Sequence, residues 1–92
     1  LLALAGRTAE EAIAEMAARI PAARLPAGAD VAGLAVARER EMPTALGHGV
    51  AVPHARVPGL AGPLVVLGRS AGGVVFDPEA PDRVHLIFLL VT

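Results

Sequence analysis

The chain has 92 residues, a length that suits one small domain, and its formal net charge is −1. This charge, together with two aromatic residues and no Trp or Tyr, argues against nucleic-acid binding and against attraction to anionic lipid. The absence of cysteine excludes disulfides, thiolate metal sites and cysteine nucleophiles.

The first predicted helix begins after Thr8. Thr8 and Glu11 have capping-box spacing, in which the hydroxyl accepts from one backbone amide and the carboxylate reaches back to another. Pro21 ends this helix. Its apolar stripe, which recurs at helical spacing, consists of Ile13, Met16, Ala17 and Ile20.

A second helix is predicted after Asp30, a plausible N-cap. Arg38 continues its apolar stripe, although an unpaired buried charge costs several kcal/mol. Two readings stay open: Arg38 turns outward or pairs with a carboxylate such as Glu41, or it reaches an anion at the end of the helix. The stripe itself is Val31, Leu34 and Ala35, and an ordinary solvated face is expected for Glu39, Arg40 and Glu41.

After Pro43 the pattern changes to β-strands. Residues 83–91 form the most apolar strand, which we expect to be central, and the apolar run 86–91 is far too short for a membrane helix of roughly 20 residues. Helices followed by strands without strict alternation predict an α/β (α+β) domain whose sheet is covered on both faces. The other expected elements are strands at 50–52 and 63–70, a turn at 70–73, and a strand at 74–76 that pairs back as a hairpin.

Three histidines are candidates for chemistry. His48, His54 and His85 are separated by six and 31 residues, spacings that match no helix-face or zinc-knuckle pattern, so no metal site is expected. His85 begins an apolar strand and is expected to be a hydrogen-bonded, partly buried side chain. His54 lies on the same side of its strand as Val50 and Val52 and is expected at the strand's end.

The surroundings of His54 favour phosphoryl transfer over acyl transfer. No GxSxG serine elbow occurs, whereas neutral imidazole is a competent nucleophile near pH 7. Gly47 and Gly49 permit backbone amides to approach an anion closely, and Arg38 and Arg56 supply charge with bidentate geometry. No P-loop is present, so nothing indicates a nucleotide donor or another cofactor.

The pair Arg38-Glu39 and the stretch "PTALGHGVAVPHAR", residues 43–56, resemble the enzyme IIA domain of the fructose/mannitol class (type 2) of the bacterial phosphoenolpyruvate-dependent sugar phosphotransferase system. That family's pattern is an acidic or amide residue, six free positions, an apolar residue and Gly, two free positions, then apolar-Ala-apolar-Pro-His and a small residue. Every fixed position is filled here, by Glu39, Leu46, Gly47, Val50, Ala51, Val52, Pro53, His54 and Ala55.

The resemblance implies that His54 accepts a phosphoryl group from the phosphocarrier protein HPr, on Nε2, and passes it to a cysteine of an enzyme IIB domain. It also implies that Arg38 lies near the phosphohistidine. Thr44, Gly47, Gly49 and Arg56 are then the expected phosphate-binding or loop residues. His48 departs from the family, whose members often have asparagine between the two glycines.

The implied fold is a three-layer α/β/α sandwich around a mixed sheet, with residues 1–92 as a partial domain truncated at both ends. An N-terminal strand and later helices, which carry a second active-site histidine in the family, are expected to be missing, and His85 does not take that place.

Three functions stay open: a phosphocarrier in sugar uptake, a regulatory domain fused to or controlling a membrane transporter or nitrogen-related regulation, and an interaction domain without phosphorylation. The first two make the chain a phosphotransferase if it is active. Both imply a cytoplasmic location, as a free domain or as the cytoplasmic domain of a membrane protein.

Overall fold

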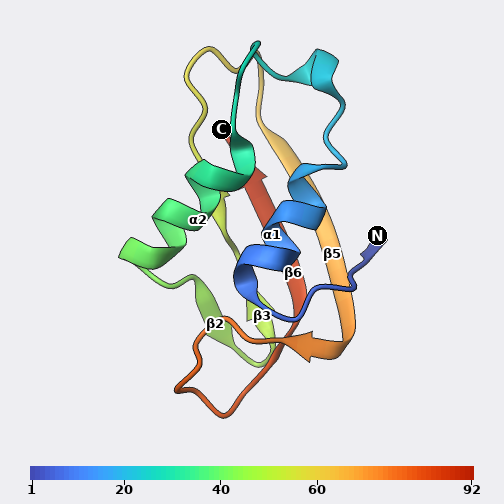
Figure 1. Ribbon diagram of the computed structural model, residues 1–92, viewed down its shortest axis with the longest axis vertical. Helices are drawn as coiled ribbons and strands as arrows, with labels where there is room; N and C mark the ends of the chain where they lie inside the picture. Colours follow the sequence, from blue (N-terminus) through green and yellow to red (C-terminus); the bar gives the residue numbers. More distant parts are fainter.

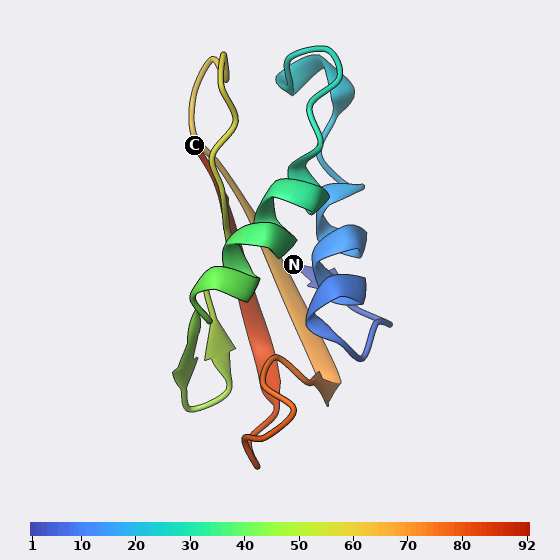
Figure 2. The same ribbon diagram turned by 60° about the vertical axis from the view of Figure 1, so that its left-hand side comes forward.

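In the computed structural model, which describes residues 1–92, one mixed sheet of six strands carries both helices on the same face (Figures 1 and 2). The helices are α1 (Ala9–Ala17) and α2 (Val31–Glu41), with a short 3-10 turn η1 (Ala22–Arg24) between them. The strands are β1 (Leu2–Ala3), β2 (Ala45–Gly47), β3 (Val50–Ala51), β4 (His54–Ala55), β5 (Leu64–Val74) and β6 (Val84–Val91).

Strand β6 is central, as its apolar sequence predicts. The strand order is β1-β5-β6-β3-β2, and β4 pairs with β6 beyond the end of β3. β5 runs antiparallel to β6, whereas β3 and β4 run parallel to it, with Val50 opposite Leu86 and His54 opposite Leu90. The expectation that an N-terminal strand is missing is wrong, because β1 pairs in parallel with β5. The sequence pattern also did not predict β2, which pairs with β3.

The predicted cap of α1 is confirmed. The Thr8 hydroxyl accepts from the Glu11 amide at 3.2 Å, and the Glu11 carboxylate accepts in return from the Thr8 amide at 3.3 Å. The same carboxylate accepts from the Arg7 amide at 2.8 Å. These amides satisfy a charged acceptor and lower the pKa of Glu11, with the Arg7 backbone as the largest cause.

Glu11 should therefore make the stability of α1 depend on pH. Because its pKa is lowered by folding, its stabilising effect is present above the ordinary carboxyl pKa and is lost as the pH falls through the folded-state value. We expect Glu11→Gln to lower the thermal midpoint at pH 7, and we expect this difference to shrink at pH 3. Glu10→Gln, on an exposed first-turn residue, is the control. A Glu11→Gln difference of equal size at both pH values would contradict the assignment.

The buried side of α2 differs from the predicted stripe. Asp30 caps the helix, accepting from the Gly33 amide at 3.0 Å as expected. The buried residues are Val31, Ala35 and Glu39, whereas Leu34 is 40% exposed. The interpretation of Arg38 as part of a core-facing stripe, and of Glu39 as solvated, is thus wrong: the helix turns so that the i, i+4, i+8 row faces the sheet.

The predicted turn at 70–73 is also wrong, because β5 continues through these residues to Val74. The Ser70 hydroxyl accepts from the Gly73 amide at 3.0 Å, and Gly73 has φ +88°, a left-handed conformation that suits glycine. This local loop shifts the register with β6 between Arg69 and Val74 without reversing the chain. The β5–β6 hairpin instead closes through residues 75–83.

The core lies between the helices and one face of the sheet. Ile13 and Met16 from α1 are fully buried there against Ile87 and Leu89 of β6. The α/β class and the mixed sheet are confirmed, and residues 1–92 supply two of the three expected layers. No helix of these residues covers the second sheet face, where Val65 is 56% exposed. Neither helix is long and apolar enough to cross a membrane.

Candidate functional site

Side chains alternate along the segment that carries His54. Ala51, Pro53 and Ala55 are buried toward the helices, whereas Val52 and His54 are half-buried on the other side of the strand. The predicted alternation is therefore correct, and His54 lies at the end of a strand, as the first residue of the two-residue β4. β4 pairs with β6, and beyond it the Val57 amide donates to the Thr92 carbonyl.

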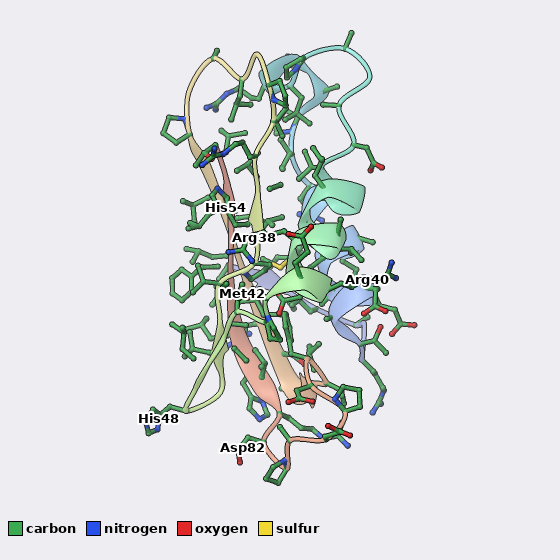
Figure 3. The ribbon with its side chains drawn as sticks, turned by 90° about the vertical axis from the view of Figure 1, so that its left-hand side faces the viewer. Arg38, Arg40, Met42, His48, His54 and Asp82 are labelled. Carbon is green, nitrogen blue, oxygen red and sulfur yellow. The ribbon has the colours of Figure 1, made fainter.

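His54 lies beside α2 because β2 pairs only with β3 and leaves the edge of β4 uncovered. A hollow of about 380 Å³ opens there between α2 and β4. It brings together three of the predicted site residues, His54, Arg38 and Arg56 (Figure 3 labels the first two). Its remaining lining residues are Leu34, Ala37 and Glu41.

Arg38 reaches the hollow from the last turn of α2. Its Nη1 donates to the Met42 carbonyl at 3.3 Å, and its Nη2 lies 3.8 Å from the Met42 sulfur. Arg38 thus contacts the backbone at the helix C-terminus rather than Glu41. Because guanidinium has five N–H donors, three remain for an anion in the hollow. In Figure 3, Arg40 lies on the other side of α2, away from His54.

The ring of His54 has one partner within the chain. Its Nε2 lies 2.8 Å from the Thr92 hydroxyl oxygen, across 38 residues of sequence. The Thr92 backbone is held on both sides, because its amide donates to the Ala55 carbonyl at 3.0 Å and its carbonyl accepts from the Val57 amide at 2.6 Å. The sequence pattern gave Thr92 no role, since only the register of β4 on β6 brings it here.

Thr44 does not line the hollow around His54. Its amide and its hydroxyl both donate to the Glu39 carboxylate, at 2.8 and 2.7 Å, and its carbonyl accepts from the Val52 amide. Glu39 is 8% exposed, so these two bonds satisfy a carboxylate that burial would otherwise penalise. Glu39 and Thr44 together tie the end of α2 to the strand that leads to His54.

Glu39→Ala should therefore destabilise the fold by about 1–3 kcal/mol, because it leaves the part-buried Thr44 amide and hydroxyl without their acceptor. Urea unfolding measures this change. Glu41→Ala, on an exposed position of the same helix turn, is the control and should change the free energy of unfolding by less than about 0.5 kcal/mol. Equal effects of the two substitutions would contradict the role given to Glu39.

Gly47 and Gly49 lie at the tip of the β2–β3 hairpin and not at the hollow around His54. Gly47, His48 and Gly49 all have positive φ, at +83°, +56° and +78°, so the glycines serve the turn. The Gly49 carbonyl accepts from the amides of His85 and Leu86, which ties the tip to β6. The expected phosphate-lining role of these glycines is therefore corrected, because the hairpin turns the tip away from β4 (Figure 3).

His85 and His48 lie near the hairpin tip. The His85 Nδ1 lies 2.8 Å from the Ser70 carbonyl oxygen, which can only accept, so Nδ1 carries a proton. His85 is thus hydrogen-bonded as expected, although it is exposed rather than partly buried. No group of three or more His, Asp or Glu side chains gathers in a way that could hold a metal ion.

The hollow brings the half-buried imidazole of His54 together with the side chains of Arg38 and Arg56 at an uncovered edge of the sheet, where another molecule can present a group to them. Arg38 and Arg56 can stabilise negative charge on that group through charge-assisted hydrogen bonds. This arrangement suits the transfer of an anionic group to or from His54 better than the hydrolysis of a neutral substrate.

A family model described as "Phosphoenolpyruvate-dependent sugar phosphotransferase system, EIIA 2" matches residues 1–92. The chain is 34% identical over 53 residues to the PTS system fructose-specific EIIABC component of Bacillus subtilis. The matched region covers 58% of this chain and 8% of that protein. The chain is also 35% identical over 54 residues to the PTS system fructose-specific EIIA component of Haloferax volcanii. This matched region covers 59% of this chain and 35% of that protein.

Among solved structures, the fold is similar to that of the nitrogen regulatory protein IIA-Ntr from Neisseria meningitidis. The TM-score is 0.84 at 30% sequence identity, over 98% of this chain and 62% of that one. The matched regions thus span about a third or less of the two curated relatives and less than two thirds of the solved neighbour.

Proposed function

Because the chain belongs to the EIIA 2 family of the phosphoenolpyruvate-dependent sugar phosphotransferase system, we propose that it carries a phosphoryl group on His54. The observation that carries this proposal is the hollow in which the half-buried His54 lies beside Arg38 and Arg56. The matched family and the two fructose-specific relatives support the same reading.

In the proposed reaction, His54 Nε2 attacks the phosphorus of a phosphorylated HPr-type carrier. The bond from Nε2 to phosphorus forms as the nitrogen–phosphorus bond of the donor breaks, and the electron pair of that bond returns to the donor nitrogen. Such a transition state needs little from the protein beyond position and positive charge around the phosphoryl oxygens. Arg38 and Arg56 line the hollow with that charge, and the phosphoryl group then passes to a cysteine of an enzyme IIB domain.

A regulatory role is the second candidate, and the similarity to the nitrogen regulatory protein IIA-Ntr favours it. Both roles use the same phosphorylated histidine, and they differ in where the phosphoryl group goes. A phosphocarrier of sugar uptake passes it on to a IIB domain, whereas a regulator keeps it as a signal for a transporter or another partner. The names of the two fructose-specific relatives favour uptake.

The test is incubation of the full chain with phosphoenolpyruvate, enzyme I and HPr, followed by intact-mass measurement. We expect a single phosphate adduct that is labile in acid and stable in base, and we expect its loss when a fructose-type IIB domain is added. An adduct that persists with IIB would favour the regulatory role. The absence of any adduct would contradict both roles.

A further inference from the structure

We propose that Thr92 is a positioning residue for His54, an inference that rests on the proposed phosphocarrier function. In the resting state the Thr92 hydroxyl donates to Nε2 and holds the ring in the orientation and tautomer that attack requires. After transfer, the same hydroxyl donates to an oxygen of the phosphoryl group on Nε2. The observation behind this proposal is the 2.8 Å contact between Nε2 and the Thr92 hydroxyl oxygen.

The Thr92 hydroxyl is held in place by the sheet. β4 and β6 are parallel with His54 opposite Leu90, so Thr92, two residues beyond Leu90, projects from the same face as His54. Backbone bonds to Ala55 and Val57 fix Thr92 on both sides of its Cα, and a β-branched side chain has few rotamers. The hydroxyl makes no other hydrogen bond within the chain and is available to the ring.

The chemistry of the ring decides which group donates. Only an unprotonated nitrogen has the lone pair that attacks phosphorus, so in the reactive tautomer Nε2 is the acceptor and Nδ1 carries the proton. A hydroxyl that faces such a nitrogen can only be the donor. A hydroxyl can also accept from a protonated Nε2, so the 2.8 Å contact fits either tautomer, and the proposal assigns the donor role to Thr92.

During transfer the hydrogen bond changes its acceptor. As the bond from Nε2 to phosphorus forms and the donor's nitrogen–phosphorus bond breaks, Nε2 loses its lone pair and the Nδ1 proton stays on the ring. The phosphorus enters the place beside Nε2 that the hydroxyl occupied, so the Thr92 side chain turns about its Cα–Cβ bond. Its proton then points to a phosphoryl oxygen, which is the stronger, charged acceptor. Arg38, from α2, and Arg56, which follows β4, both line the hollow and contact the other phosphoryl oxygens.

The experiment compares Thr92→Val, which keeps the shape and removes the hydroxyl, with Thr92→Ser, which keeps the hydroxyl. In the full chain with ¹⁵N-labelled histidine, ring nitrogen chemical shifts report the tautomer of His54, and single-turnover phosphorylation by HPr reports the rate. We expect the Nδ1–H tautomer in the wild type, a mixed tautomer with about 5–10-fold slower phosphorylation in Thr92→Val, and recovery of both in Thr92→Ser.

A purely structural role for Thr92 would leave the tautomer unchanged. The proposal is overturned if Thr92→Val has the same His54 tautomer and the same rate as the wild type, or if Thr92→Ser behaves like Thr92→Val while both keep the native amide spectrum. Wild-type protein that takes up no phosphate would overturn the proposed function instead. In that case, the His54 ring-nitrogen chemical shifts of the wild type and Thr92→Val would still test the hydrogen bond between Thr92 and His54.

Discussion

Replacing His54 with alanine is expected to abolish phosphorylation by HPr, lowering the rate by at least about 10³-fold, because the substitution removes the only imidazole that lines the hollow. The rate of phosphate incorporation, followed by intact mass, measures this loss. His54→Gln should show the same loss while keeping a side-chain amide near the Thr92 hydroxyl, so a preserved circular dichroism spectrum separates lost chemistry from lost structure.

The matched controls are the other two histidines. His48 has φ +56°, so asparagine, which tolerates the left-handed conformation, is the substitution that leaves the hairpin tip unstrained. His48→Asn and His85→Ala should both keep the wild-type rate, because neither side chain lines the hollow around His54. Phosphate incorporation that survives in His54→Ala and disappears in His85→Ala would contradict the assignment.

Replacing Arg38 with alanine should slow phosphorylation by about 10²-fold, equivalent to about 2.7 kcal/mol of transition-state stabilisation. The guanidinium has N–H donors beyond those that contact Met42, and it lines the hollow with His54. The free energy of unfolding should fall by only about 0.3–1 kcal/mol, the contribution of a cation near a helix C-terminus. Arg38→Lys should recover part of the rate, since lysine keeps the charge but not the planar fork.

Arg40→Ala is the control for Arg38→Ala, because both arginines lie in the last turn of α2 and only Arg38 lines the hollow. Both substitutions should lower stability to a similar extent, and only Arg38→Ala should lower the transfer rate. If Arg38→Ala unfolds the protein as severely as loss of a core leucine and leaves the rate per folded molecule unchanged, Arg38 is structural.

Local sequence signals predicted the features that depend on neighbouring residues. The Thr8–Glu11 capping box and the Asp30 cap are interactions across three residues, and both are confirmed. The period of two along 50–54 correctly assigned His54 to the side of Val50 and Val52. The apolar run 86–91 correctly indicated the central strand.

The errors lie where tertiary structure overrides local preference. Ser70 and Gly73 are good turn formers, yet their own hydrogen bond makes a local irregularity that β5 passes through in its pairing with β6. The glycines of the "GHG" stretch looked suited to an anion, but the β2–β3 hairpin uses their positive φ angles for its turn. In α2, spacing alone did not reveal that Glu39 rather than Leu34 faces the interior.

Thr92 and Glu39 depend on contacts that no local pattern encodes. Thr92 reaches His54 only through the parallel register of β4 and β6, 38 residues along the chain. Glu39 was assigned to a solvated face because its partner Thr44 belongs to the next segment, beyond the end of α2. For Thr92, the sequence shows only a hydrogen-bond donor near the end of the central strand. For Glu39, it shows only that a carboxylate fills a fixed position of the family pattern.

The most direct measurement is nuclear magnetic resonance of the full chain, labelled with ¹⁵N-histidine and phosphorylated through enzyme I and HPr. We expect a single ring nitrogen, Nε2 of His54, to show coupling to ³¹P; in the resting state this nitrogen lies 2.8 Å from the Thr92 hydroxyl oxygen. Coupling to a ring nitrogen of His48 or His85, or phosphate uptake with no coupling to any histidine nitrogen, would contradict the proposed site.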